Sequence, residues 1–152
     1  QLIFPENVDL NQGLNLTKSD YDFLLKKMSI LPRESHNPEY DMDQYYDGYC
    51  KFFLYGDKKE KISDDIRIFN KVGLAYGFLL DNAYIVDFKN NVEFFLSAVI
   101  YGNENEILND NTYEYDTLTI PFLADLGRVV YNYELQRKKE NVPDLNRFRF
   151  NY

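Results

Sequence analysis

Residues 67–101 have the sequence RIFNKVGLAYGFLLDNAYIVDFKNNVEFFLSAVIY, the densest β-forming stretch in the chain. Residues 67–71 start it as a short predicted strand, and residues 77–88 and 92–101 are two long apolar runs. The turn between these runs is predicted at 89–91, because asparagine tolerates positive φ angles and bonds its own backbone. The pattern predicts an antiparallel hairpin and, with the first segment, a sheet of at least three strands.

Apolar residues at helical spacing predict helices on both sides of this stretch. Thr17 can cap a helix over 18–30, with Asp20 in its first turn and Pro32 beyond its end. A second helix is predicted over 44–54, ending at Gly56. Its shared face would hold Tyr46, Tyr49, Cys50 and Phe53. A third is predicted over 120–138, with an apolar face of Phe122, Leu126, Val129, Val130 and Tyr133.

Helices segregated from an antiparallel sheet predict the α+β fold class, and 152 residues suit one domain. The long strands are apolar at nearly every position, so we expect both sheet faces to be covered. One final helix cannot cover two faces, so the helices that precede the sheet, or other segments, must contribute. Residues 1–16 are expected to be extended or coiled, and 102–116 form an acidic loop. The tail, residues 141–152, would either pair as a short strand or lie over the surface.

Composition excludes several classes of partner. With 17 basic and 25 acidic residues the net charge is −8, which disfavours nucleic acid and anionic membrane surfaces. No apolar run approaches the roughly 20 residues needed for a transmembrane segment. Cys50 is the only cysteine, so no internal disulfide is possible, and a small buried side chain on a helix face is expected.

Other residue clusters give weak signals. His36 is the single histidine and is expected at the surface, so a multi-histidine metal site has little support. Asp41, Asp43 and Asp47 match a calcium loop only in part. We therefore expect neither a metal nor a cofactor. Four tyrosines could form a sugar-stacking platform; they are Tyr40, Tyr45, Tyr46 and Tyr49. The helical spacing of Tyr46, Tyr49 and Phe53 favours core packing instead.

One short motif could carry chemistry. Lys71 lies at the end of the first predicted strand, and Gly73 follows two positions later. A strand edge lets a ligand lie alongside as an extra strand, and glycine removes a side chain that would block it. The lysine ammonium supplies a point charge for a carboxylate. Alone, Lys-x-Gly more often marks a solvated turn.

Segments covering most of the chain resemble the serine β-lactamase and penicillin-binding-protein superfamily, specifically the β-lactamase-like serine hydrolases of Bacteroidetes-type bacteria. They are LTKSDYDFLLKKMSILPRES, YYDGYCKFFLYGD, RIFNKVGLAYGFLLDNAYIVDF, NNVEFFLSAVIYGNENEILND and YEYDTLTIPFLADLGRVVYNYE. The resemblance aligns Lys71, Val72 and Gly73 with the family's Lys-Thr/Ser-Gly motif on the strand beside the active site. It implies that Lys71 faces a substrate carboxylate and that the Leu74 backbone N–H joins the oxyanion hole. Val72 lacks the motif's hydroxyl, which argues against β-lactam hydrolysis more than against the fold.

The family's nucleophile, a serine in Ser-x-x-Lys, is absent. None of the chain's serines has a lysine three positions later; they are Ser19, Ser29, Ser35, Ser63 and Ser97. Tyr101-Gly102-Asn103 has the letters of the family's second motif but follows the Lys-x-Gly strand instead of preceding it. Together with a start at Gln1, this predicts a single partial domain over 1–152, the C-terminal part of a longer serine hydrolase. These residues alone are expected to be catalytically inactive.

By resemblance, the parent enzyme would transfer an acyl group to serine and then hydrolyse it. Its substrate would be a small-molecule or peptide-like carboxylate containing an amide, ester or lactam, and its location the periplasm or cell envelope. The missing N-terminal part of the domain would be a partner, and exposed apolar surface would promote association. The alternative is a non-catalytic, acidic, Tyr-rich module that binds a glycan or peptide. An unpaired strand edge beside an apolar patch would favour the partial domain over the module.

Overall fold

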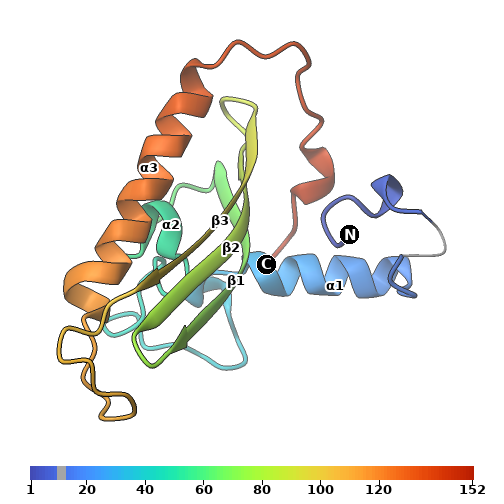
Figure 1. Cartoon of the computed structure of the whole chain (residues 1–152). Coiled ribbons are helices and arrows are strands. Elements are labelled where there is room, and N and C mark those ends of the chain that lie inside the picture. Colours follow the sequence, from blue (N-terminus) through green and yellow to red (C-terminus); the bar gives the residue numbers. More distant parts are fainter. Residues whose placement is uncertain (10–12) are drawn as a thin grey trace.

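The computed structural model describes residues 1–9 and 13–152 and has an α+β architecture, in which a three-stranded antiparallel sheet carries helices on both faces (Figure 1). Its main elements are α1 (Lys18–Ser29), α2 (Phe52–Tyr55), β1 (Ile66–Ala75), β2 (Phe78–Asp87), β3 (Val92–Tyr101) and α3 (Ile120–Gln136). Short 3-10 helices lie at Pro5–Asn7, Pro32–Glu34 and Asn146–Phe148, and a π-helical turn at Tyr115–Thr119 precedes α3. No helix in the described ranges is long and apolar enough to cross a membrane.

The sheet has the order β1-β2-β3, and the predicted hairpin is confirmed. The first strand is longer than predicted, because its pairing with β2 continues past Gly73 to Ala75. Tyr76 and Gly77 form the connecting turn with φ angles of 51° and 87°, the positive pair that a two-residue type I′ hairpin requires. The predicted turn at 89–91 is also confirmed, with Asn91 at a φ of 52°.

One sheet face, called here the first face, packs against α2 and α3. Ile68, Leu79 and Ile85 are buried there with Phe53 and Leu123. The predicted apolar face of α3 is wrong in part, because Phe122, Val129 and Tyr133 are largely exposed. The buried side instead holds Leu123, Ala124 and Gly127. Small residues are needed there because a Cβ at position 127 would lie 2.6 Å from the Leu54 backbone nitrogen.

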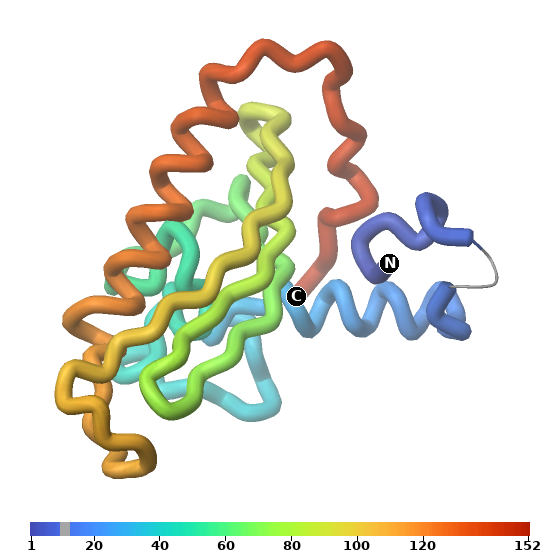
Figure 2. The backbone as a smooth tube through the Cα atoms, in the orientation of Figure 1, coloured from blue at the N-terminus to red at the C-terminus, as the bar shows by residue number. Residues whose placement is uncertain are grey.

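The opposite face, called here the second face, is covered by both ends of the chain together with α1 (Figure 2). Phe69, Tyr84 and Val86 from the sheet form one buried cluster there. Their partners are Ile3, Leu25, Leu145 and Phe148. The expectation that both faces are covered is therefore confirmed only in part, because Phe78, Leu80, Val99 and Tyr101 on the second face stay exposed. The tail lies over the sheet without pairing as a strand. Residues 1–9 contain one 3-10 turn, whereas residues 10–12, also expected to be coil, lie outside the described residues.

The helix predicted over 44–54 is wrong. Cys50 and Leu54 have φ angles of 58° and 71°, which a right-handed helix excludes. Only the four residues of α2 are assigned to a helix, with non-helical angles inside it. Interactions distant in sequence override the helical spacing. Asp47 is bound by the Arg33 guanidinium and, at 2.8 Å, by the Ile62 backbone N–H.

The helix predicted over 18–30 is confirmed as α1. Its start is a capping box: the Asp20 backbone N–H donates to Thr17 Oγ1 at 3.3 Å, and the Thr17 backbone N–H donates to Asp20 Oδ2 at 2.8 Å. The cap satisfies backbone donors that the first turn leaves without partners.

Thr17→Ala is expected to lower the free energy of unfolding by about 1 kcal/mol, the usual effect of losing an N-cap side chain. Denaturant titration followed by circular dichroism measures this. Ser19→Ala is the matched control, because Ser19 is exposed in the same turn and caps nothing. If the two variants were equally stable, the cap would not contribute.

Candidate functional site

β1 presents an open edge. The Phe88 N–H donates to the Asp65 carbonyl at 2.8 Å, and bonded pairs alternate along an antiparallel ladder. The backbone groups of Arg67, Phe69, Lys71 and Gly73 therefore face β2, whereas those of Asn70, Val72 and Leu74 point away from it. No strand in the described part of the chain pairs with this outer side of β1.

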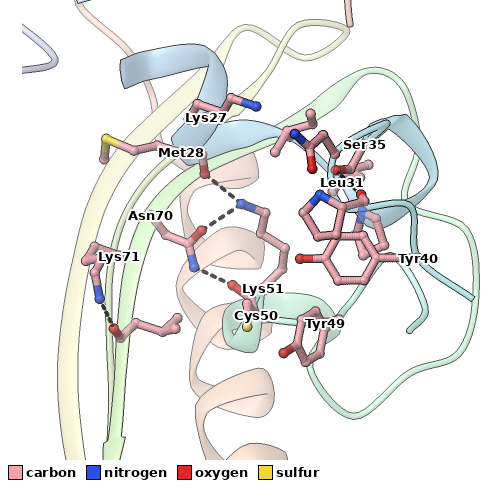
Figure 3. Close-up of a pocket in the computed structure, with 15 residues that line it drawn as sticks. Lys27, Met28, Leu31, Ser35, Tyr40, Tyr49, Cys50, Lys51, Asn70 and Lys71 are labelled. Atoms are coloured by element: carbon pink, nitrogen blue, oxygen red, sulfur yellow. Dashed lines mark hydrogen bonds between the residues drawn. The ribbon is translucent and has the colours of Figure 1, made fainter. Parts of the chain in front are cut away.

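A cavity of about 300 Å³ lies beside this edge (Figure 3). Its walls are the last turns of α1, the loop that follows it, residues 49–51 and residues 70–72 of β1. The capped helix and the strand are regular elements, whereas residues 49–51 owe their path to the left-handed backbone at Cys50. The cavity thus sits where three separate segments of sequence meet.

Three buried polar side chains connect the cavity wall to the centre of the sheet. Lys51 is only 4% exposed, and its Nζ donates to the Met28 carbonyl and to Asn70 Oδ1, both at 2.7 Å (Figure 3). Asn70 Nδ2 donates to the Cys50 carbonyl at 2.8 Å and to Asp81 Oδ1 at 2.9 Å. Asp81 is fully buried and also accepts the Phe53 N–H at 3.4 Å. Asn70 therefore links a buried cation to a buried anion.

Burial shifts the titration of these groups. It lowers the pKa of Lys51 to about 8, although the negative charge of Asp81 opposes the shift. It raises the pKa of Asp81, although hydrogen bonds from Asn70 and the Phe53 backbone oppose that shift. Burial likewise raises the pKa of the Cys50 thiol, which lines the same cavity. At neutral pH Lys51 is thus mainly a cation in an environment with little water.

Only two of the four residues predicted to bind substrate line the cavity. Lys71 and Val72 line the cavity, whereas Gly73 and Leu74 lie further along β1, outside its lining. The Lys71 side chain is exposed, and its Nζ donates to the Val72 carbonyl at 2.6 Å. A Cβ at position 73 would lie 2.9 Å from Leu80 Cδ2, the end of an exposed side chain that can move aside.

Sequence reasoning missed Lys51, Asn70 and Asp81. A usable signal existed, because Lys51 interrupts the apolar run YCKFFLY and Asp81 interrupts FLLDNAY. A charge inside an apolar run is buried more often than one in a polar segment and then needs a partner. The expectation that Cys50 is buried on a helix face is wrong: the residue is half-buried and lies in a turn.

The weaker candidates are not arranged to hold a metal ion in the described part of the chain. His36 is exposed, as expected, and Asp47 is an acceptor for Arg33. Among the described residues, no group of histidine, cysteine, aspartate and glutamate is arranged to hold a metal ion. The core packing predicted from the spacing of Tyr46, Tyr49 and Phe53 is confirmed for Phe53, which is fully buried, and wrong for Tyr49, which is 46% exposed. Tyr49 instead packs ring against ring with Tyr40 and Tyr45 beside the cavity. The ring centroids of Tyr40 and Tyr49 are each within 5.3 Å of that of Tyr45.

Comparison of the chain with protein-family models, with curated proteins and with solved structures finds no match.

Proposed function

We propose that these 152 residues form one wall of the acyl-transfer site of a β-lactamase-like serine hydrolase, as the C-terminal part of its domain. The observation that carries the proposal is the outer edge of β1. Val72 and Leu74 direct their backbone groups away from β2, and Gly73 stands between them without a side chain. An extended substrate can bind to such an edge through main-chain hydrogen bonds.

Each residue of this segment would have a separate role. The Leu74 N–H would donate to the oxyanion that forms during acyl transfer. The exposed Lys71 ammonium would turn from the Val72 carbonyl toward a substrate carboxylate. Val72 offers no hydroxyl, so the preferred substrate would be a small or peptide-like amide or ester bearing a carboxylate. The nucleophilic serine and its activating lysine would come from chain preceding residue 1, and the chemistry needs no metal or organic cofactor.

The far side of the sheet supports a partner in the same domain. Phe78, Leu80, Val99 and Tyr101 lie exposed on the second face, beyond the part that the tail covers. Within the described chain, nothing pairs with the outer edge of β3. An apolar face beside an unpaired edge is a surface that normally has a partner. The preceding part of the domain would cover it, in the periplasm or cell envelope.

The alternative function, a glycan- or peptide-binding module, is favoured by one observation. Tyr49 is 46% exposed and packs with Tyr40 and Tyr45 at the mouth of the cavity. Exposed aromatic rings of this kind can stack on a flat ligand. The module would need no serine and no preceding domain, so the same experiment separates the two functions.

The test uses the gene product at its native length, treated with a fluorescent fluorophosphonate that labels activated serines. We expect labelling at a Ser-x-x-Lys serine upstream of residue 1 and none in residues 1–152 alone. Lys71→Ala should lower kcat/KM for a carboxylate-bearing ester by about tenfold or more, as expected for loss of one charge-assisted hydrogen bond. Lys89→Ala, at an exposed turn, should leave it unchanged. A native product that starts near Gln1 and takes no label would refute the hydrolase and leave the module.

A further inference from the structure

The cavity beside β1 has a charge unlike that of the whole molecule. Its lining includes Lys27, Lys51 and Lys71 but neither aspartate nor glutamate, although the chain carries a net charge of −8. A concave site that is lined by lysine and by no carboxylate has a more positive local potential than the rest of this acidic chain. Such a potential favours an anion over a neutral or cationic ligand.

Lys51 gives this site a specific anchor. Both hydrogen-bond partners of its Nζ, the Met28 carbonyl and Asn70 Oδ1, are neutral oxygens. Asp81 is reached only through Asn70 and does not line the cavity. An ammonium has three hydrogens to donate, and two are used. A lysine is rarely buried to this degree unless an opposite charge contacts it, and in the described residues no carboxylate forms an ion pair with Lys51.

The remaining walls suit an apolar, flat body. The rings of Tyr40 and Tyr49 lie 5.9 Å apart between centroids, and Leu31, Pro32 and Val72 complete the apolar lining. A volume of about 300 Å³ is at the lower end of the range for small-ligand sites. One aromatic ring or a branched acyl chain with a single charged group fits these properties.

We propose that this cavity binds a small organic carboxylate, with the Lys51 ammonium as its ion-pair partner and its apolar body between the tyrosine rings and Leu31. The proposal requires neither a catalytic serine nor the outer edge of β1 at Leu74. It is therefore independent of the hydrolase function, and either can fail without the other.

The first test is a titration of the 152-residue protein with benzoate, followed by shifts of backbone amide resonances in nuclear magnetic resonance spectra. We expect saturable shifts at Cys50, Lys51 and Asn70, and affinity for benzyl alcohol at least tenfold weaker. Lys51→Met should lower the benzoate affinity by at least tenfold. The matched control, Lys89→Met, removes a lysine far from the cavity and should change it less than twofold. Equal binding of benzoate and benzyl alcohol would overturn the proposal.

A second measurement on the unmodified side chain covers the case in which Lys51→Met does not fold. Because the pKa of Lys51 is about 8, the affinity for benzoate should be constant between about pH 6 and 7. Above about pH 8 it should fall by up to about tenfold per unit as the ammonium loses its proton. The titratable or charged groups that act on Lys51 are Asp81 on β2, Arg67 on β1, Glu34 and the neighbouring Cys50 thiol.

The neighbouring Cys50 thiol could imitate this titration, since a thiolate would also repel benzoate. The pH series is therefore repeated with Cys50→Ala, which should show the same fall. An affinity that stays constant to about pH 9.5 in both proteins would exclude Lys51 as the anion's partner.

Discussion

Asn70→Leu is expected to lower the free energy of unfolding by about 3–5 kcal/mol, the usual cost of leaving buried charged groups without their partner. The leucine fills a similar volume but satisfies none of the three groups that Asn70 bonds, namely Lys51 Nζ, Asp81 Oδ1 and the Cys50 carbonyl. Lys51 and Asp81 would then face each other across an apolar side chain. Denaturant unfolding followed by circular dichroism gives the free-energy change.

Asn82→Leu is the matched control for this network. Asn82 lies on the adjacent strand, opposite Lys71, and is exposed. The same chemical change there should alter stability by no more than about 0.5 kcal/mol. If both variants lost the same stability, the effect would come from leucine in the sheet and the buried network would contribute nothing.

Gly127→Ala should lower the free energy of unfolding by about 2 kcal/mol, a typical result of overpacking in a core. In an ordinary helix, replacing glycine by alanine stabilises by about 1 kcal/mol. The sign of the free-energy change at position 127 therefore shows whether the close contact exists. The new Cβ would lie 2.6 Å from the Leu54 nitrogen and 3.0 Å from Phe53 Cβ. The backbone at Leu54 cannot easily move away, because Arg128 Nη1 donates a hydrogen bond to the Leu54 carbonyl at 2.8 Å and the same guanidinium pairs with Asp57.

Val129→Ala serves as the control in the same helix. Val129 is 67% exposed, so its replacement should raise stability by a few tenths of a kcal/mol through helix propensity alone, about 0.5 at most. Thermal unfolding of the two variants side by side is sufficient. A Gly127→Ala protein more stable than the parent would show that α3 does not approach the loop this closely.

The parts of the fold that follow from local sequence were predictable. The two apolar runs and the asparagines between them predicted β2, β3 and the turn at 89–91. The Thr17 cap predicted the start of α1. The prediction of a helix over 44–54 was wrong because Asp47 and Lys51 form hydrogen bonds with residues far away in the sequence. The prediction of the buried face of α3 was wrong in part because the helix packs closely against Phe53 and Leu54 at Gly127, and this contact decides which side faces the core.

The candidate site was predictable only where a motif lies within a few residues. Lys71 and Val72 were identified, and both line the cavity. The bonds of Lys51 to Met28 and Asn70 span 23 and 19 positions, and no local spacing encodes them. Asp81 is 11 positions from Asn70 but on the neighbouring strand, so only the register of the hairpin brings the two together.

The closure of the second face by both chain ends has a consequence for synthesis on the ribosome. Arg147 pairs with Glu6 at 2.5 Å and also donates to the Ile3 carbonyl, and the rings of Phe4 and Phe148 are 6.0 Å apart. Nothing made before residue 145 can complete this cluster. At about 5–20 residues per second, the nascent sheet leaves Phe69 and Tyr84 without the Leu145 and Phe148 side of their cluster for roughly 2–10 s after β3 is made. During that interval the unfinished protein presents an aromatic surface to ribosome-associated chaperones and to other nascent chains.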